Sequence, residues 1–478
     1  MISRVFVFCV VMVASSCAQT FETLASFDST DGSFPTDALV QAFDGTLYGT
    51  TVDGGTYSCG TAFKISPDGT LKTVHSFNGN DGCQVIPGLI QGEDGNFYGA
   101  SATGIGGTCE SGYGTVFKMT SQGIVSVLYD FCTQASGSTG EFPYATLVQG
   151  FDGNFYGTTQ EGGTGPCPVG GCGTIFKITS EGTLTTLHSF DGPDGYILYS
   201  SLVEADDGNF YGTTSAGGAS YYYGYGTVFK ITPQGVLTTL YSFCSTLNCA
   251  DGSYPYAGLV QDSHGMFYGT TEYGGTGSCS LGCGTVFRIT KEGVLTTLHS
   301  FDGTDGEAPY SKLALGSDGN LYGTTSAGGF YNWGTIFEIT PSGVLTTLHT
   351  FSQTDGSLPI GGLTQATNGL FYGLTAGGGT STACSGGGCG TAYRLSVGLG
   401  PFVTTQPTSG EAGAHVIILG NQLTGATSVT FNGAVADFKV ISSTAIVTKV
   451  PSGATSGEVT VSSPTGALKS NIPFHVEP

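Results

Sequence analysis

Apolar or aromatic residues alternate with polar ones in short segments along most of the chain, and none of these segments has the 3.6-residue period of a helix. The pattern is clearest in residues 147–190. There it predicts four strands, at residues 147–150, 154–159, 174–179 and 184–190. Asp152-Gly153 supplies the positive φ angles of a tight hairpin, and a second turn follows at 180–182. A glycine-rich loop at 162–173 joins the two middle strands.

This four-strand unit is repeated along the chain. The Tyr-Gly pair of its second strand recurs seven times, about 54 residues apart on average. The tyrosines of these pairs are Tyr48, Tyr98, Tyr156, Tyr211, Tyr268, Tyr322 and Tyr372. The Gly-Thr-x-aromatic motif of the third strand follows each pair and ends at Phe63, Phe117, Phe176, Phe229, Phe287, Phe337 and Tyr393. Seven units of four strands predict an all-β fold, a seven-bladed β-propeller whose four-stranded blades surround a channel.

The two ends of the repeat region predict how the ring closes. The seventh copy stops at residues 394–396 and has no fourth strand. A match to the missing pattern, Leu-Thr-Thr-Leu-His-Ser-Phe, lies at residues 20–27, ahead of the first copy. We expect this N-terminal strand to pair with the last blade and close the ring, because an unpaired sheet edge invites aggregation.

Residues 1–18 have the features of a signal peptide. A basic residue, Arg4, precedes an apolar stretch at 5–13 that is too short to span a membrane. Ser16-Cys17-Ala18 fits a small-x-small cleavage site. The alternative is a lipoprotein processed at Cys17, although residues 14–16 match the usual pattern poorly. We therefore expect a secreted or bacterial cell-surface protein with no transmembrane segment in the mature chain.

Composition and charge narrow the classes of partner. The chain contains 81 glycines, 10% charged residues and a net charge of −22. The negative charge disfavours nucleic acid and an anionic membrane surface as partners. The glycines fall at fixed repeat positions among many aromatic residues, which is typical of ordered β structure rather than disorder. We expect a monomer whose partner is an extracellular carbohydrate or protein.

The cysteines also favour export. Outside the signal region twelve remain, an even number, and all fall in or beside loops that share one propeller face. We predict six disulfides on that face: Cys59 with Cys83, Cys109 with Cys132, Cys167 with Cys172, Cys244 with Cys249, Cys279 with Cys283, and Cys384 with Cys389. They would restrain glycine-rich loops whose ordering costs entropy. Metal binding is disfavoured, because the spacings differ and no histidine lies at a useful distance in the sequence.

Some residues capable of chemistry recur from blade to blade. The same fourth-strand position holds His75, His188, His299 and His349, with Tyr129 and Tyr241 in two other blades. This repetition indicates packing, because a catalytic histidine needs its own oriented partner. The loops between blades carry Asp-x-x-Asp-Gly motifs, such as Asp28 with Asp31, which fit turns or, alternatively, a weak calcium site. We predict no catalytic residues, no metal site and no other cofactor.

The loops between the second and third strands differ most among the copies, as expected of a binding surface on a rigid scaffold. Their unusual aromatic residues are Tyr57, Tyr113, Tyr221, Tyr222, Tyr223, Tyr225, Tyr331 and Trp333. A flat aromatic ring can stack on a sugar or a peptide, so one hypothesis is that these residues bind a ligand. The alternative is that they pack against the neighbouring blade.

The composition changes after residue 400. Residues 402–478 contain no cysteine and no copy of the repeat. Strand patterns lie at 416–420, 428–431, 445–450, 457–462 and 473–476, and Asn432-Gly433 marks a hairpin. They predict a small immunoglobulin-like β-sandwich. Its Pro407-x-x-Gly410, Gly420-x-x-Leu423 and Val450-Pro451 motifs resemble the IPT/TIG family, which implies an interaction or spacer module.

The repeats resemble a family as well. Gly-Asn-Phe-Tyr-Gly-Thr-Thr, Gly-Thr-Val-Phe-Lys-Ile-Thr and Leu-Thr-Thr-Leu-His-Ser-Phe are similar to the GloVer tandem repeat of "choice-of-anchor" bacterial exported proteins. The resemblance implies surface export with interchangeable C-terminal attachment modules, and it carries no assigned activity or catalytic residue. We therefore divide the chain into a signal peptide (1–18), a propeller (19–400) and an immunoglobulin-like domain (401–478).

Two classes of function fit these features. We favour a non-catalytic secreted or cell-surface protein that binds carbohydrate or protein through the variable loops of one propeller face. The alternative is an extracellular propeller enzyme, a hydrolase or lyase acting on polysaccharide. An enzyme should place acids or bases that break the repeat symmetry around the channel, and Glu161, Glu272 and Glu307 are the first charges to examine.

Overall fold

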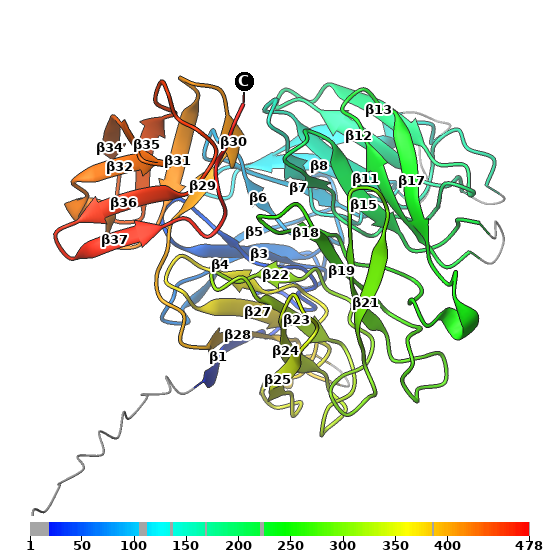
Figure 1. Ribbon diagram of the computed structural model, residues 1–478. Helices are drawn as coiled ribbons and strands as arrows, with labels where there is room; N and C mark the ends of the chain where they lie inside the picture. Colours follow the sequence, from blue (N-terminus) through cyan, green and yellow to red (C-terminus); the bar gives the residue numbers. More distant parts are fainter. Residues whose placement is uncertain are drawn as a thin grey trace, which may run out of the picture.

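The computed structural model describes residues 19–104, 112–133, 137–167, 170–219, 224–384 and 387–477. Seven four-stranded antiparallel sheets follow one another around a common axis, and a smaller β domain packs beside them (Figure 1). The predicted fold is therefore confirmed: an all-β seven-bladed propeller followed by an immunoglobulin-like β-sandwich.

Each blade runs outward from a short inner strand. Blade one comprises β2 (Val40–Gln41), β3 (Leu47–Thr51), β4 (Thr61–Ile65) and β5 (Leu71–Ser76); blade two comprises β6 (Ile90–Gln91), β7 (Phe97–Ser101), β8 (Thr115–Met119) and β9 (Val125–Asp130). Blade three comprises β10 (Val148–Gln149), β11 (Phe155–Thr159), β12 (Thr174–Ile178) and β13 (Leu184–Ser189); blade four comprises β14 (Val203–Glu204), β15 (Phe210–Thr214), β16 (Thr227–Ile231) and β17 (Leu237–Ser242). Blade five comprises β18 (Val260–Gln261), β19 (Phe267–Thr271), β20 (Thr285–Ile289) and β21 (Leu295–Ser300); blade six comprises β22 (Ala314–Leu315), β23 (Leu321–Thr325), β24 (Thr335–Ile339) and β25 (Leu345–Thr350). Short 3₁₀ turns lie at Phe131–Thr133 and Leu247–Cys249.

The ring closes with a strand from the start of the propeller. Blade seven contains β26 (Thr364–Gln365), β27 (Phe371–Thr375) and β28 (Thr391–Ser396), and its outer strand is β1 (Thr20–Ser26). Strand β1 pairs antiparallel with β28, with Thr20 opposite Ser396 and Ser26 opposite Thr391. The predicted closure by the N-terminal strand is confirmed, and it removes the free outer edge of β28.

The repeated Tyr-Gly pair explains how blades pack. A Cβ atom added to Gly157 would lie 2.5 Å from Cζ of Phe176 in the next strand, so only glycine fits there. Next to it, the hydroxyl of Tyr156 donates a hydrogen bond to Asp152 Oδ2 at 2.9 Å. The same ring lies 4.1 Å, centroid to centroid, from Phe210 of the next blade. The pair therefore packs both within a blade and between blades.

A second repeated feature joins each blade to the one before it. Shortly before the inner strand of each blade, one non-glycine residue adopts a left-handed backbone conformation. These residues are Phe34, Gln84, Phe142, Ile197, Tyr254, Ala308 and Leu358. The N–H of each donates to a carbonyl of the preceding blade, as from Tyr254 to Tyr225 at 2.8 Å. A left-handed conformation costs about 1 kcal/mol or more at such residues. The hydrogen bonds between blades hold the backbone in this strained form.

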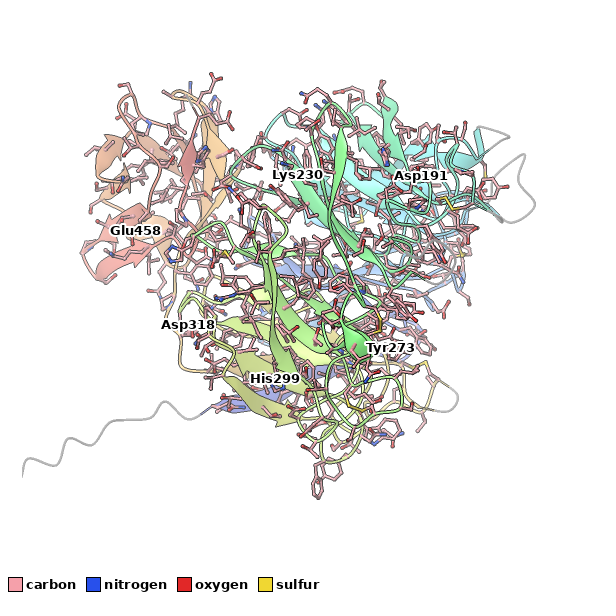
Figure 2. All side chains as sticks on the ribbon, turned by 45° about the vertical axis from the view of Figure 1, so that its right-hand side comes forward. Asp191, Lys230, Tyr273, His299, Asp318 and Glu458 are labelled. Carbon is pink, nitrogen blue, oxygen red and sulfur yellow. A yellow bond between two sulfur atoms is a disulfide. The ribbon has the colours of Figure 1, made fainter. Side chains whose placement is uncertain are left out.

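The propeller has two different faces. We call the face that carries the connections between second and third strands, and between blades, the loop face. The opposite side, which carries the Asp-Gly turns, is the turn face. In Figure 2 Asp318, in one of these turns, lies on the side toward the C-terminal domain, whereas Tyr273 and Asp191 lie on the side away from it.

The C-terminal domain is a small sandwich. One sheet contains β29 (Thr404–Gln406), β31 (His415–Leu419), β35 (Ala445–Lys449) and β34 (Phe438–Val440); the other contains β33 (Ala434–Ala436), β32 (Ser428–Phe431), β36 (Val459–Ser463) and β37 (Gly466–Lys469). A parallel pair, β30 (Ser409–Gly410) with β38 (His475–Val476), and a 3₁₀ turn at Leu423–Gly425 complete it. The core between the sheets is built from residues such as Val416, Ile418 and Phe431.

This domain contacts the turn face. The Thr444 hydroxyl donates to the Phe43 carbonyl at 2.8 Å, beside an Asp-Gly turn. The Gln406 amide donates to the Gln91 carbonyl at the end of an inner strand. The sandwich therefore covers the turn-face end of the propeller axis, leaving the loop face as the exposed end.

Five of the six predicted cysteine pairs are disulfide-bonded in the structure. They are Cys59–Cys83, Cys167–Cys172, Cys244–Cys249, Cys279–Cys283 and Cys384–Cys389. The sixth prediction involves Cys109, which lies outside the described residues. The first bond joins loops of two successive blades, and the other four close short loops.

Candidate ligand-binding channel

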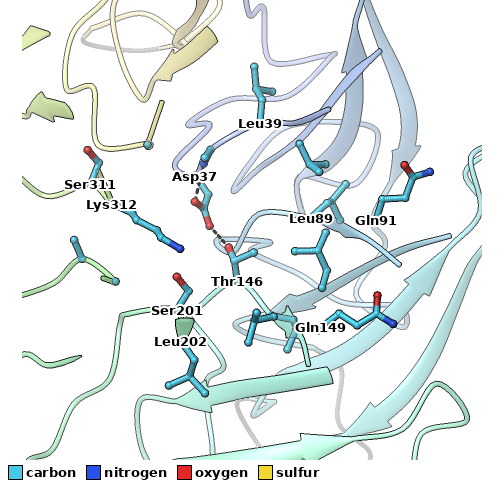
Figure 3. Close-up of a pocket in the computed structure, with 18 of the residues that line it drawn as sticks. Asp37, Leu39, Leu89, Gln91, Thr146, Gln149, Ser201, Leu202, Ser311 and Lys312 are labelled. Carbon is cyan, nitrogen blue, oxygen red and sulfur yellow. Dashed lines mark hydrogen bonds between the residues drawn. The ribbon is translucent and has the colours of Figure 1, made fainter. Parts of the chain in front are cut away.

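The propeller axis contains a cavity of about 670 Å³. Its wall is the segment that leads into the inner strand of each blade, and its turn-face end is lined by residues 405–408 of the C-terminal domain. Figure 3 shows side chains from several blades pointing into this space. A cavity of this size, with apolar walls and a few polar groups, is typical of a small-molecule site.

Tyrosines line the loop-face end of the cavity on four successive blades. They are Tyr144, Tyr199, Tyr256 and Tyr310. Neighbouring ring centroids lie 5.6, 5.1 and 4.6 Å apart, so the rings form a continuous arc. The other three blades place Thr36, Ile86 and Ile360 at the equivalent position. The arc therefore makes one side of the channel aromatic and the other side aliphatic.

Polar groups of the loop face surround this arc. The Gln160 side-chain amide donates to the Tyr199 hydroxyl at 2.6 Å. Glu272 lies close enough to Tyr256 and Tyr310 for its negative charge to raise the pKa of both phenols, although burial is the larger cause. Burial also raises the pKa of Glu272 itself. Glu161 acts similarly on Tyr144, again after burial.

The third glutamate that the sequence marked for examination, Glu307, is at one end of a β-bridge with Ala327. Its negative charge contributes to the raised pKa of Tyr273, after burial and the interaction with Glu272. Glu161 and Glu272 therefore lie next to the tyrosine arc, whereas none of the three lines the cavity.

An aspartate network crosses the channel wall between three blades. Asp37 Oδ2 accepts hydrogen bonds from the Gly88 N–H at 2.7 Å and from the Thr146 hydroxyl. Asp37 Oδ1 also accepts from the N–H of Ala38 at 2.6 Å. No other blade has an acid at this position: the equivalents are Pro87, Ala145, Ser200, Ala257, Ser311 and Gly361. This carboxylate breaks the repeat symmetry and is well supplied with donors.

Lys312 is the second departure from symmetry. Its equivalents on the other blades are small: Ala38, Gly88, Thr146, Ser201, Gly258 and Gly362. Figure 3 shows its side chain extending across the space left by these small residues, toward Asp37, Thr146 and Ser201. Burial lowers the pKa of Lys312, and the negative charge of Asp37 partly opposes this. No hydrogen bond or ion pair joins its ammonium to a residue in the described part of the chain.

The predicted aromatic residues that the structure describes lie elsewhere on the loop face. Tyr113, Tyr225 and Trp333 precede the Gly-Thr of the third strand, where the other four blades have Cys59, Cys172, Cys283 and Cys389. Tyr113 packs on Phe142 of the next blade and Tyr225 on Tyr254, at centroid distances of 5.9 and 5.7 Å. Tyr221, Tyr222 and Tyr223 lie outside the described residues.

Other predicted aromatics are at the surface. Tyr57 is 60% exposed and Tyr331 is 54% exposed. Tyr331 contacts Phe330, which is 85% exposed, and Trp333 beside them is 38% exposed. These residues form a second possible contact surface, separate from the channel. None of the five predicted aromatics that the structure describes lines the cavity.

The repeated histidines have defined partners. His75, His188, His299 and His349 each contact an aspartate of the following loop through Nε2, at 2.8, 2.7, 2.7 and 3.0 Å. In two of the four cases, Asp194 and Asp305, that aspartate is the second of an Asp-x-x-Asp motif. It also accepts a backbone N–H, as Asp194 does from Asp191. The aspartates considered for calcium are thus engaged in local bonds. Within the ranges that the structure describes, no group of three or more His, Cys, Asp or Glu could hold a metal.

The tyrosine arc was missed in the sequence. Three of its members follow a proline, as Pro143-Tyr144, Pro255-Tyr256 and Pro309-Tyr310, and the fourth, Tyr199, follows Leu198. The signal was therefore present as a repeated x-Tyr at a fixed distance before Tyr-Gly. It lies before a two-residue strand that has no recognisable periodicity.

The fold and this cavity define the class of protein: a seven-bladed β-propeller with an axial cavity, followed by an immunoglobulin-like sandwich. The model of the Gloeobacter/Verrucomicrobia repeat matches residues 9–224, 88–278 and 204–433 in overlapping segments. The chain belongs to this family. The IPT/TIG domain model matches residues 402–476, so the sandwich is an IPT/TIG domain. No curated protein matches the sequence.

Solved structures are similar to this one at low sequence identity. A fungal alcohol oxidase of the AA5 family, in complex with copper, is 11% identical with a TM-score of 0.54, over 95% of this chain and 98% of that one. A proposed 6-phosphogluconolactonase from Bacteroides uniformis is 17% identical, with a TM-score of 0.44, over 69% and 88% of the two chains. A gluconolactonase from Xanthomonas campestris is 14% identical, with a TM-score of 0.39, over 67% and 91%. At 11% identity, the likeness to the oxidase shows the fold alone.

Two findings bear on location. The five disulfides indicate an extracellular, oxidising environment. Among the described residues, no helix is long and apolar enough to cross a membrane.

Proposed function

We propose that the protein is a non-catalytic exported binding protein, secreted or held at the cell surface, that takes a saccharide into the loop-face end of its propeller channel. The observation that carries the proposal is the arc of Tyr144, Tyr199, Tyr256 and Tyr310 at the end of an axial cavity. The proposed site therefore lies beside the variable loops of the favoured face, inside the ring rather than on the loops themselves.

The arc suits sugars for two reasons. Stacked aromatic faces present a flat apolar surface of the kind that packs on the C–H face of a pyranose ring. The phenol hydroxyls and the Gln160 amide provide hydrogen-bond donors and acceptors at the edge of that surface. Burial raises the pKa of Tyr199, so its hydroxyl stays protonated at neutral pH and can donate.

A rigid frame supports such a site. The four tyrosines lie on successive blades that are joined by backbone hydrogen bonds, such as Tyr254 N–H to the Tyr225 carbonyl at 2.8 Å. The ring positions are therefore fixed before a ligand arrives. Binding to a pre-formed site avoids the entropic cost of ordering it.

A glycan array probed with purified mature protein tests the proposal. Hits are then measured by titration calorimetry with the wild type and with Tyr256→Ala and Tyr310→Ala. We expect each substitution to weaken binding at least tenfold, whereas Tyr256→Phe keeps most of the affinity because the ring remains. Tyr57→Ala, which removes an exposed tyrosine outside the cavity, serves as the control. No glycan signal above background, or equal affinity in all variants, would refute the proposal.

One observation favours a second candidate, a propeller enzyme that hydrolyses or eliminates polysaccharide. Lys312 and Asp37 break the repeat symmetry inside the channel, and burial raises the pKa of Glu272 beside the tyrosine arc. Buried acids and bases with shifted pKa values are common where catalysis occurs. Incubating the glycans that bind with the protein, and assaying new reducing ends and unsaturated products, distinguishes the two. Turnover that is lost in Glu272→Gln or Lys312→Met would establish the enzyme.

A further inference from the structure

The channel contains a cation without a partner. Among the residues that the structure describes, Lys312 is the only basic one that lines the cavity, and the other charged lining residues are Asp37 and Glu93. The chain carries 13 lysines and arginines against 35 acids, so a basic group is scarce and acids to pair with it are plentiful. Even so, its ammonium forms no ion pair with any described residue, whereas Lys118 and Lys177 each pair with an aspartate within 2.7 Å.

The nearest acid to Lys312 is already satisfied. Asp37 accepts bonds from the Gly88 N–H, the Ala38 N–H and the Thr146 hydroxyl. Three donors hold this carboxylate against the channel wall, and its negative charge still favours the charged form of Lys312. Asp37 forms no hydrogen bond or ion pair with Lys312 among the described residues, and its negative charge partly offsets the lowering of the Lys312 pKa by burial. The nitrogen of Lys312, which can donate three hydrogen bonds, lies near Thr146 and Ser201 in Figure 3.

Lys312 is half-buried, and an ammonium that loses part of its hydration inside a cavity is stabilised by an anionic hydrogen-bond partner. The cavity offers room for that partner, because the equivalent positions on the neighbouring blades are Gly258 and Gly362. The partner must be anionic to offset the loss of hydration, and it must be small enough to lie between these walls. A carboxylate meets both conditions.

We propose that the ligand is an acidic saccharide, and that the carboxylate of its terminal uronic acid pairs with Lys312 while its ring lies against the Tyr256 and Tyr310 rings. This inference rests on the proposed binding function and specifies its ligand class. The two tyrosines belong to blade five and to blade six, and Lys312 follows Tyr310 by two residues on the same wall. The stacking surface and the cation are thus adjacent.

The charge of the loop face limits how many carboxylates the ligand carries. Glu161 and Glu272 lie by the tyrosine arc, and Glu141 adjoins Glu161 through a β-bridge. These acids would repel a polyanion as it enters. The ligand is therefore one in which a single terminal uronic acid enters the channel and neutral sugars follow it toward the loop face.

Matched ligands test this inference. A panel of disaccharides, each a uronic acid linked to a neutral sugar, is titrated beside the methyl ester of the same disaccharide. The ester keeps every ring and hydroxyl but has no charge. Because a hydrogen bond to a charged group contributes about 1.5 to 3 kcal/mol, we expect the acid to bind wild type about ten- to a hundredfold more tightly than the ester.

Variants of Lys312 test whether this residue causes the preference for the acid over the ester. Lys312→Met keeps the length of the side chain and removes its charge, and we expect it to bind acid and ester equally, with the ester affinity of the wild type. Lys312→Arg retains part of the preference. Lys72→Met removes the same charge from an exposed strand position outside the cavity, and the preference should persist in it. Thermal melting of each variant checks that the fold is retained.

The outcomes separate this inference from the proposed function. Equal binding of acid and ester by wild type, or a preference that survives in Lys312→Met, overturns the uronate assignment and leaves saccharide binding intact. Absence of binding of any glycan, charged or neutral, overturns both.

Discussion

The outer strands of the blades and the channel wall differ in how far their residues repeat from blade to blade. In the blades, the same residues recur at each position: Tyr-Gly is present in all seven copies, and the second strand is buried throughout its length in each. Along the channel wall the positions differ, from glycine to Thr146, Ser201 and Lys312. Packing of one blade on the next demands the repeated residues. The wall faces a cavity, so blade packing does not constrain its side chains. These positions can therefore carry side chains that suit a ligand.

This comparison predicts two kinds of variant. A change in the repeated frame should lower stability and leave the ligand affinity of the folded protein unchanged. A change in the channel wall should lower the ligand affinity and leave the stability unchanged.

The disulfide that joins two blades should make the largest contribution to the free energy of unfolding. Cys59 and Cys83 are separated by 24 residues, whereas Cys279 and Cys283 are separated by 4. The loop-entropy relation gives about 3.5 kcal/mol for the first bond and about 2 kcal/mol for the second. We expect the Cys59→Ser/Cys83→Ser variant to lose more unfolding free energy than Cys279→Ser/Cys283→Ser, as measured by denaturant unfolding. Equal losses would show that closing the longer loop gives no extra stability.

Adding a single methyl group at a repeated glycine of a blade should also lower the free energy of unfolding. In Gly157→Ala the new Cβ would lie 2.5 Å from Phe176 and 2.7 Å from the Leu147 side chain, both inside the blade. We expect the unfolding free energy to fall by about 2 kcal/mol, as in overpacked cores. Gly400→Ala, where nothing lies within 4 Å of the added Cβ, is the control. An unchanged melting temperature in Gly157→Ala would contradict the steric reason for the repeated glycine.

A buried acid of the frame should make stability depend on pH. Burial raises the pKa of Glu204 to about 8, opposed by the hydrogen bond that its carboxyl accepts from the Phe151 N–H. Its equivalent in blade three is Gln149, whose side-chain oxygen accepts the N–H of Glu93. Because the folded protein holds this proton more tightly than the unfolded chain, stability present below the ordinary glutamate pKa is lost as the pH rises toward 8.

Replacing that acid tests its contribution. Glu204→Gln keeps the acceptor and removes the charge, so its melting temperature should exceed that of wild type at pH 9 and differ little at pH 4. At high pH the unfolding free energies of the two proteins should differ by on the order of 2 kcal/mol. Partial solvent access to Glu204 makes this less than its full pKa shift would give. A constant difference between pH 4 and pH 9 would contradict the assigned pKa.

The smallest effect concerns the exposed aromatic loop. Tyr331 is 54% exposed and contacts Phe330, which is itself 85% exposed. We expect Tyr331→Ala to change the unfolding free energy by less than about 0.5 kcal/mol, as is usual at the surface. We also expect it to leave glycan affinity unchanged in calorimetry. A large loss of affinity would move the binding site from the channel to this loop.

The fold could be predicted from the sequence because packing imposes a repeat. The Tyr-Gly pairs, the Asp-Gly turns and the unpaired strand at 20–27 each mark one part of a blade, and seven copies fix their number. The loop cysteines were also predictable, since short spacings such as Cys279 to Cys283 leave few partners. The strained residue before each inner strand was not, because Phe34, Gln84 and Ala308 share no side-chain chemistry.

The candidate site could not be predicted for a related reason. Asp37 and Lys312 lie at opposite ends of the sequence of the ring, and they approach each other only when blade seven joins blade six to blade one. Neither belongs to a motif. The predicted aromatics were chosen because they interrupt variable loops, yet Tyr113 and Tyr225 pack between blades. The tyrosine arc is a repeated feature in four blades, and repetition was taken as a sign of packing alone.

The central claim is that a saccharide enters the channel and places an acidic group at Lys312. A crystal structure of the protein soaked with the tightest-binding uronic-acid disaccharide tests it most directly. The account predicts sugar density inside the ring, with a carboxylate oxygen within hydrogen-bonding distance of Lys312 Nζ and a pyranose ring against Tyr256 or Tyr310. Density at the Phe330–Trp333 loop, with the channel free of sugar, would contradict it.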